Sequence, residues 1–242
     1  MGHRGASAYA PENTASAFDL AIEQGANGLE TDVRSTKDGV LVLFHDDDML
    51  RMTGVPGMIS DYTYNEISQL DVIGGVNNDV IDSIMTFEQF LERYSHRNLA
   101  FSIEIKQDGI EKQIIDMLNK YNMQKAKTSI ISFNIEHLRN VRKYTKDYNL
   151  GYLIKEYTTS IDDEMSELGM TLISPRTKII LDKDVVLYMH SKGYTVQSWG
   201  AYIEKSIRLT YDLGVDAMVV DQPDILIKYI NEIHNTKGGE IE

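Results

Sequence analysis

The first residues that suggest chemistry are the two carboxylates of Glu30-Thr31-Asp32, within a short run typical of a β-strand. Successive side chains of a strand point to opposite faces, so Glu30 and Asp32 share one face. Two acids turned toward an interior would repel each other and lose hydration, and a divalent cation between them relieves both penalties. The alternative is a solvated strand that exposes both acids.

The same spacing returns at Glu104 and Lys106, which share one face of a strand while apolar residues occupy the other. An inward Glu104 can complete an oxygen site with Glu30 and Asp32. Such carboxylate-rich coordination suits Mg²⁺ or Ca²⁺ better than Zn²⁺. We therefore expect one divalent cation there, with Lys106 placed to neutralise a phosphate oxygen. The alternative is a buried Glu–Lys ion pair without a ligand.

Two histidines stand beside charged residues, His3 before Arg4 in a turn with glycine and His45 before Asp46 at the end of a β-forming run. One imidazole can act as base and the other as acid in phosphodiester cleavage. Arg4 stays charged and offers a fork of donors that suits phosphate oxygens. Otherwise His3 belongs to a basic terminus, and His45 is a surface residue in a mostly solvated acidic turn at residues 46–48.

The single tryptophan, Trp199, ends a predicted strand and is placed to wall the alcohol part of a substrate, although a core or rim aromatic fits its position equally well. The candidate site thus combines expected metal ligands, acid–base residues and substrate-binding residues. They are Glu30, Asp32 and Glu104 for the metal, His3 and His45 for proton transfer, and Arg4, Lys106 and Trp199 for the substrate.

Short β-forming runs alternate with amphipathic helical stretches along most of the chain. Strands are expected at 28–33, 40–44, 99–105, 128–131, 150–154, 171–174, 194–198 and 216–220, and helices at 14–24, 86–94, 109–121, 135–146, 182–191, 203–212 and 224–233. Such alternation predicts a parallel sheet with crossover helices. About eight strands favour a closed TIM-type (β/α)8 barrel over an open doubly wound sheet, with chemistry at the carboxyl ends of the strands.

Residues 46–82 interrupt this rhythm with several glycines, a proline and one short amphipathic piece. We expect residues 1–242 to form a single barrel domain with a small insertion at about 46–82, after the second strand region. A small separate lid domain is the alternative.

Composition narrows the functional classes. The 242 residues include no cysteine, which excludes thiolate ligands and nucleophiles, and the net charge of −13 argues against nucleic acid and anionic lipid surfaces as partners. No apolar run reaches the length of a transmembrane helix and no signal peptide is visible, so we expect a cytoplasmic protein without a stable membrane anchor.

Taken together, the motifs resemble those of the glycerophosphodiester phosphodiesterase family. The resemblance spans nearly the whole chain and is most specific in the first fifty residues. It rests on His3-Arg4-Gly5, Pro11-Glu12-Asn13-Thr14, Gly28-Leu29-Glu30-Thr31-Asp32-Val33, Thr36-Lys37-Asp38-Gly39, His45-Asp46, Arg51 with Thr53, Glu104-Ile105-Lys106, Ser132-Phe133, Gly214-Val215-Asp216, Asp221 and Pro223.

This resemblance implies a TIM barrel that hydrolyses glycerophosphodiesters to sn-glycerol 3-phosphate and an alcohol, in lipid and glycerol metabolism. It implies the same metal, acid–base and phosphate-holding roles for the candidate residues, with Trp199 on the glycerol or head-group side. Two features depart from the family pattern. Only Met1 and Gly2 precede His3, and Gly200-Ala201-Tyr202 follows Trp199 where Thr-Val-Asn is common.

Two other functions fit the same motifs. A related barrel phospholipase, of lysophospholipase D or phospholipase C type, would need an apolar rim such as residues 49–59. A barrel that binds phosphodiesters with little turnover is the alternative outside the enzymes.

Overall fold

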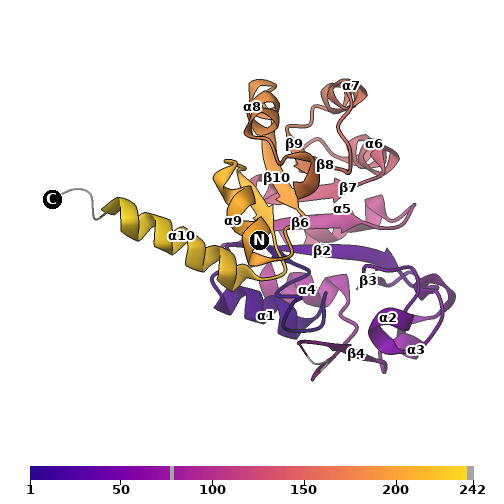
Figure 1. The fold of residues 1–242 in the computed structure, drawn as a ribbon. Coiled ribbons are helices and arrows are strands. Elements are labelled where there is room, and N and C mark those ends of the chain that lie inside the picture. Colours follow the sequence, from indigo (N-terminus) through magenta and orange to yellow (C-terminus); the bar gives the residue numbers. More distant parts are fainter. Residues whose placement is uncertain (77–78, 239–242) are drawn as a thin grey trace.

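Eight parallel strands form a nearly closed barrel in the computed structural model, which describes residues 1–76 and 79–238 (Figure 1). A bridge between Gly2 and Val220 brings the first strand against the last. The predicted TIM-type barrel is therefore confirmed. Its strands in sheet order are β1 (Gly2–His3), β2 (Gly28–Ser35), β6 (Ala100–Ile105), β7 (Thr128–Ser132), β8 (Asn149–Ile154), β9 (Leu172–Pro175), β10 (Thr195–Trp199) and β11 (Ala217–Val219).

Helices alternate with these strands. They are α1 (Ala15–Glu23), α4 (Phe87–Tyr94), α5 (Glu111–Lys120), α6 (Ile135–Tyr144), α7 (Ser160–Glu167), α8 (Lys183–Ser191), α9 (Glu204–Asp212) and α10 (Pro223–Gly238). The sequence reading missed α7, because this short and mostly polar helix buries only Ile161 and Met165.

The main apolar core lies between the barrel and its helices. Leu29 and Val33 on β2 are fully buried in one cluster with Phe18 of α1 and Phe90 of α4. The rings of Phe18 and Phe90 meet edge to face with centroids 4.9 Å apart. Since these apolar side chains of β2 belong to the outer layer, the alternate positions Glu30 and Asp32 face the barrel interior.

One strand prediction is wrong in its placement. β3 (Leu41–Leu43), expected among the barrel strands as residues 40–44, pairs antiparallel with the end of β2 and lies outside the barrel. The turn between them contains Gly39 with φ of 81°, a conformation that suits a tight hairpin. The eighth barrel strand is instead the two-residue β1.

Residues 46–76 and 79–82 pack beside this hairpin in a layer of short elements, visible next to β3 in Figure 1. Phe44, Met49, Ile59 and Ile67 belong to a separate apolar cluster there. The reading of 1–242 as one domain with an insertion stays a prediction; residues 77 and 78, within the proposed insertion, lie outside the described residues. The elements are α2 (Leu50–Thr53), the 3-10 turn η1 (Ile59–Asp61), α3 (Tyr64–Ile67), β4 (Asp71–Gly74) and β5 (Val80–Ser83).

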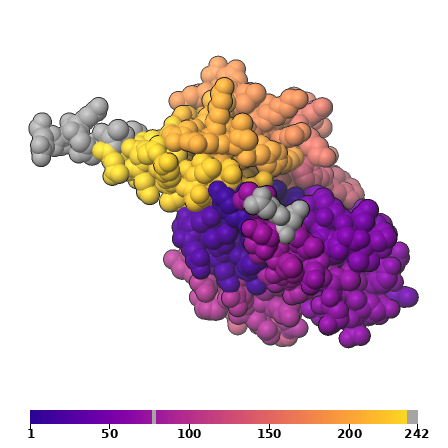
Figure 2. All heavy atoms as spheres, turned by 60° about the horizontal axis from the view of Figure 1, so that its bottom comes forward, coloured from indigo at the N-terminus to yellow at the C-terminus, as the bar shows by residue number. Residues whose placement is uncertain are grey.

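Helix α10 projects away from the body of the protein, as the yellow segment of Figures 1 and 2 shows. Its first turns contact the barrel through Ile225, Leu226 and Ile230, which pack with α9 residue Ile207. Across residues 1–76 and 79–238, no helix combines the length and the apolar character that crossing a bilayer requires.

Candidate active site

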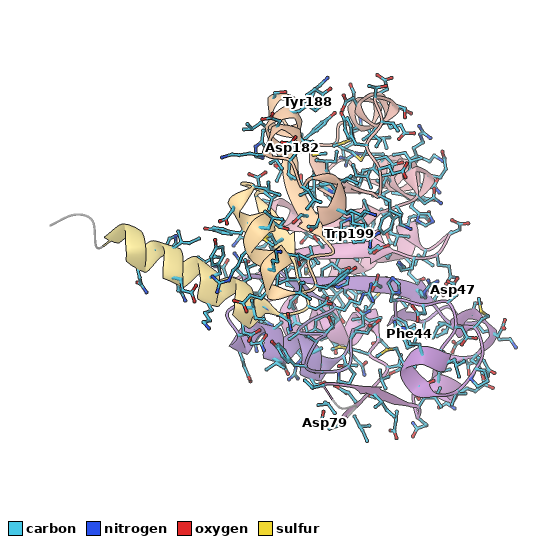
Figure 3. The ribbon with its side chains drawn as sticks, in the orientation of Figure 1. Phe44, Asp47, Asp79, Asp182, Tyr188 and Trp199 are labelled. Atoms are coloured by element: carbon cyan, nitrogen blue, oxygen red, sulfur yellow. The ribbon has the colours of Figure 1, made fainter. Side chains whose placement is uncertain are left out.

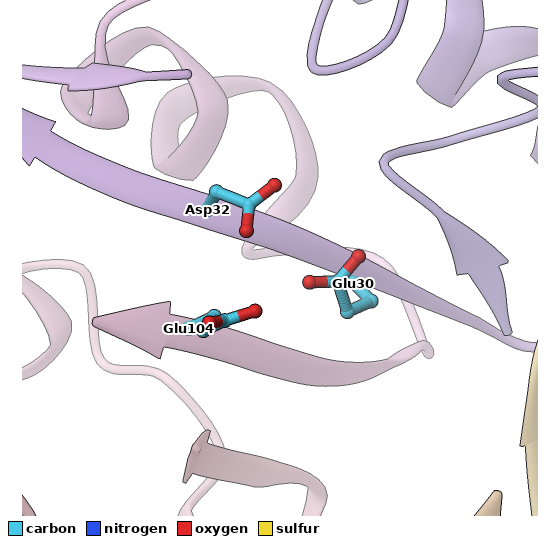
Figure 4. Close-up of side chains that lie close together, drawn as sticks. All are labelled: Glu30, Asp32 and Glu104. Carbon is cyan, nitrogen blue, oxygen red and sulfur yellow. The ribbon is translucent and has the colours of Figure 1, made fainter. Parts of the chain in front are cut away.

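Three carboxylates meet inside the barrel (Figure 4). Glu30 and Asp32 come from β2 and Glu104 from the adjacent β6, where Asp32 and Glu104 occupy paired positions. One oxygen from each lies within 4.8 Å of the others, and all three residues are buried. The structure therefore brings the three predicted metal ligands together.

The environment of these acids disfavours three negative charges. Burial, followed by the charge of Asp32, raises the pKa of Glu30 well above its ordinary value and the pKa of Glu104 to about 7. Burial also acts to raise the pKa of Asp32, but the nearby Arg4 and Lys106 outweigh it and hold that pKa below its ordinary value.

The donor set fits a hard divalent cation. Its donors are carboxylate oxygens, which Mg²⁺ and Ca²⁺ prefer. Oδ1 of Asp32 is buried and accepts no hydrogen bond, an uncommon state for a carboxylate oxygen that cation binding would explain. These three residues can thus hold a divalent cation of this kind.

Two cations lie against the acids. The Arg4 backbone N–H donates to Glu30 Oε2 at 3.0 Å, and its Nε lies 3.0 Å from Asp32 Oδ2. Arg4 has a φ of 55°, an uncommon conformation for a residue other than glycine. Lys106 Nζ lies 3.0 Å from Glu104 Oε1 and 3.7 Å from Asp32 Oδ1. Both predicted phosphate-binding residues therefore border the candidate metal site.

Both predicted catalytic histidines line the same cavity, and each contacts its own carboxylate. His3 Nδ1 lies 2.5 Å from Asp221 Oδ1, and His45 Nδ1 lies 2.6 Å from Asp46 Oδ1. Because each contact is made by Nδ1, these carboxylates do not engage Nε2 of either ring. The contacts also fix the orientation of each ring. Burial, as the largest influence, lowers the pKa of His45, which favours its neutral form.

Sequence reasoning underrated Asp46, which it took as part of a mostly solvated acidic turn. Asp46 accepts from Arg51 Nε at 2.5 Å as well as contacting His45. Arg51 also donates to Glu12, at 2.6 Å and 2.9 Å, and Glu12 in turn accepts from Arg4 at 3.0 Å. An ionic chain therefore links the loop of His45 to the turn of Arg4.

Asn13 was also not predicted as a site residue. Thr14 is the N-cap of α1, whereas Asn13 is buried with a φ of 61°. Its amide donates to Asp32 Oδ2 at 2.9 Å and accepts from the Thr31 hydroxyl at 2.8 Å. Its place in the motif Pro11-Glu12-Asn13-Thr14 was the signal that the sequence offered.

Trp199 forms part of the opposite wall of the cavity, whose volume is about 420 Å³. Figure 3 places it at the end of β10 on the barrel. Its indole N–H donates to the Ser174 carbonyl oxygen at 3.0 Å, and Phe133 meets its ring edge to face at 5.2 Å. Phe133 was not predicted as a site residue.

Comparison with known proteins identifies the family. The glycerophosphoryl diester phosphodiesterase family model matches residues 3–225. The chain belongs to this family. A relative from Caldanaerobacter subterraneus subsp. tengcongensis, named glycerophosphodiester phosphodiesterase, is 30% identical over 99% of this chain and 98% of its own length.

Solved structures of the family share the fold of this member. A phosphodiesterase from Oleispira antarctica, solved with the product sn-glycerol-3-phosphate, is 26% identical with a TM-score of 0.86 and 95% of both chains covered. A glycerophosphodiester phosphodiesterase from Thermotoga maritima is 27% identical with a TM-score of 0.77, covering 94% of this chain and 96% of its own.

Proposed function

We propose that this chain hydrolyses glycerophosphodiesters to sn-glycerol 3-phosphate and an alcohol, with one divalent cation and a pair of catalytic histidines. The observation that carries the proposal is the joint placement of three buried carboxylates, two cations and two carboxylate-bound imidazoles around one cavity. Family membership over residues 3–225 supports the same reaction.

With all three acids ionised, the state that suits cation binding, charge arithmetic favours a phosphodiester only when that cation is present. Ionised Glu30, Asp32 and Glu104 carry three negative charges, and Arg4 and Lys106 carry two positive ones. The group is then net negative and would repel a phosphodiester anion, whereas two further positive charges reverse its sign. The cation would supply Lewis acidity, polarising a phosphoryl oxygen and offsetting charge in the transition state.

The chain itself supplies positioning and proton transfer. Arg4 and Lys106 hold the non-bridging phosphate oxygens, because both lie beside the acids at the base of the cavity. One histidine removes the proton from the attacking hydroxyl, which is water or the neighbouring glycerol hydroxyl. The other gives a proton to the leaving alcohol. Asp221 and Asp46 hold the rings in place for these transfers.

Turnover of glycerophosphoglycerol with Mg²⁺ or Ca²⁺, against an EDTA control, tests the proposal. We expect Glu104→Ala to abolish turnover and weaken metal binding measured by calorimetry, and His3→Ala or His45→Ala to reduce kcat roughly 10²–10⁴-fold. His190→Ala is a matched control, since His190 contacts Asp216 at 2.9 Å and does not line the cavity. Full activity in EDTA, or losses below tenfold for both histidine variants, would refute the scheme.

One observation supports phospholipase activity as the alternative function. Leu50 and Met58, in the segment next to His45, are 54% and 40% exposed. Turnover of lysophosphatidylcholine at a rate above that of glycerophosphocholine would favour it. We expect the reverse order, since Arg51 and the three aspartates at 46–48 line the same surface pocket as Leu50.

A further inference from the structure

The cavity has two chemically different halves. One half is ionic and contains the proposed catalytic groups. The other is apolar, with Ile131, Phe133, Leu153 and Trp199 in its wall, and Lys155 and Tyr202 also line the cavity. Among the described residues, the only acids that line the cavity are Glu30 and Glu104, both in the ionic half. An alcohol group leaving from phosphorus toward the apolar half therefore meets no carboxylate.

Two basic side chains stand over the aromatic wall. Lys155, just after β8, places Nζ 5.1 Å from the centroid of the Phe133 ring. Arg176, just after β9, places its guanidinium carbon 5.7 Å from the centroid of the Trp199 ring. A quaternary ammonium head group binds to free aromatic faces of this kind. Here cations of the protein already cover a face of each ring and would repel such a head group.

Both cations remain available to an anion. Neither Lys155 nor Arg176 forms an ion pair with a carboxylate among residues 1–76 and 79–238, although the chain carries a net charge of −13. Both residues are exposed, just after the carboxyl ends of the neighbouring strands β8 and β9. Among the described residues, no carboxylate therefore neutralises either charge.

The unusual residues after Trp199 lie beside Arg176. Gly200 has a φ of 87°, and a Cβ atom there would lie 3.4 Å from Arg176 Cγ and 3.7 Å from the Tyr202 hydroxyl oxygen. These are ordinary contact distances, so the backbone conformation rather than the available space favours glycine at this position. The turn that departs from the family's Thr-Val-Asn thus lies against both Arg176 and the Tyr202 hydroxyl.

We propose that Lys155, Arg176 and Tyr202 form a head-group subsite that selects glycerophosphodiesters whose alcohol carries its own negative charge, as a carboxylate or a second phosphate. The inference rests on the proposed function, because it assigns the substrate class of that same site. Lys155 and Arg176 attract the anionic group and Tyr202 donates a hydrogen bond to it. Cationic head groups such as choline are disfavoured by the same charges.

Four diesters that share the glycerophosphoryl half test the subsite. They are glycerophosphoglycerol, its terminally phosphorylated form, glycerophosphoglycerate and glycerophosphocholine. We expect kcat/KM for the better anionic diester to exceed that for neutral glycerophosphoglycerol roughly tenfold, as for one or two charge-assisted contacts at a solvated rim. The choline diester should be the poorest substrate. Whichever anionic diester gives the larger ratio identifies phosphate or carboxylate as the preferred group.

The ratio of kcat/KM for an anionic diester to kcat/KM for the neutral diester, measured in one variant, separates head-group selection from general effects on catalysis. In Lys155→Met/Arg176→Gln the anionic-to-neutral ratio should fall close to one, and Gly200→Ala should lower it by straining the turn that lies beside Arg176 and carries Tyr202. Lys183→Met, at the start of α8, removes one positive charge from a residue that does not line the cavity and should leave the ratio unchanged. Increasing salt should weaken the wild-type preference.

The two proposals fail in different ways. Turnover of the neutral diester with equal or better turnover of the choline diester would overturn the subsite and leave the hydrolase intact. A preference for anionic diesters that persists in the double variant would also overturn it. Absence of turnover with all four diesters would overturn the proposed function and, with it, the subsite.

Discussion

Replacing Glu30 by glutamine should stabilise the metal-free protein while it removes activity. Glu30 is buried, and one of its oxygens lies within 4.8 Å of those of Asp32 and Glu104. Two charges at that distance repel by about 3.5 kcal/mol at an effective dielectric constant of about 20. Glutamine keeps the shape and an acceptor for the Arg4 N–H but carries no charge.

Two effects reduce that figure. The Arg4 backbone hydrogen bond to a neutral acceptor is weaker than that to a carboxylate by about 1 kcal/mol. The raised pKa also lets wild-type Glu30 take up a proton and avoid part of the repulsion. We therefore expect Glu30→Gln to gain about 1–2 kcal/mol in EDTA, a rise in Tm of about 2–8 °C for a chain of this size.

Adding Mg²⁺ or Ca²⁺ should reverse the order. A cation at one hundred times its Kd stabilises the wild type by about 2.7 kcal/mol, and the variant, with a ligand charge removed, gains much less. Differential scanning calorimetry with and without EDTA measures both terms. Glu111→Gln, at a buried glutamate of α5 outside the cavity, is the matched control and should respond to metal as the wild type does. A Glu30→Gln protein less stable than wild type in EDTA, or equally stabilised by metal, would refute the reasoning.

Three further outcomes follow from the contacts. Asp221→Asn should lower kcat roughly 10–100-fold with little change in KM, because His3 loses its orienting carboxylate, and steady-state kinetics measures this. Arg51→Met should lower kcat about tenfold and Arg51→Lys less, since the bridge between two site loops is lost; equal kcat in all three proteins would contradict it. Partial burial acts to raise the pKa of Asp19, but hydrogen bonds from Arg93 and a tyrosine hold it below its ordinary value. That contribution to stability is present above about pH 4 and is lost as pH falls further, so the Tm deficit of Asp19→Asn should shrink in acid melts.

The barrel and its inward acids were predictable from local pattern. Alternation within Glu30-Thr31-Asp32 places both acids on one face whatever the rest of the chain does, and the spacing of Glu104 and Lys106 does the same. The parallel pairing of β2 with β6 then brings the two pairs together. Periodicity also located most helices, because each has a buried stripe.

What the sequence did not predict depends on long-range partners. Periodicity cannot distinguish β3 as a hairpin strand from a barrel strand, since both are short apolar runs. The partner of His3 is Asp221, 218 positions away, which only barrel closure brings near. The sequence likewise did not predict the cations over the aromatic wall. Lys155 and Phe133 follow the neighbouring strands β8 and β7, and the side-by-side order of strands is set by the tertiary fold.

The shortest strand of the barrel, β1, affects both the closure of the barrel and the proposed active site. β1 spans two residues, yet His3 N–H donates to the Val220 carbonyl oxygen at 2.9 Å and Gly2 pairs with Leu29 on the other side. This two-residue strand therefore closes the barrel and also contains one of the two proposed catalytic histidines. Local unfolding at that edge would separate His3 from His45 while most of the fold stayed intact. The lifetime of the active protein therefore depends on the local stability of β1.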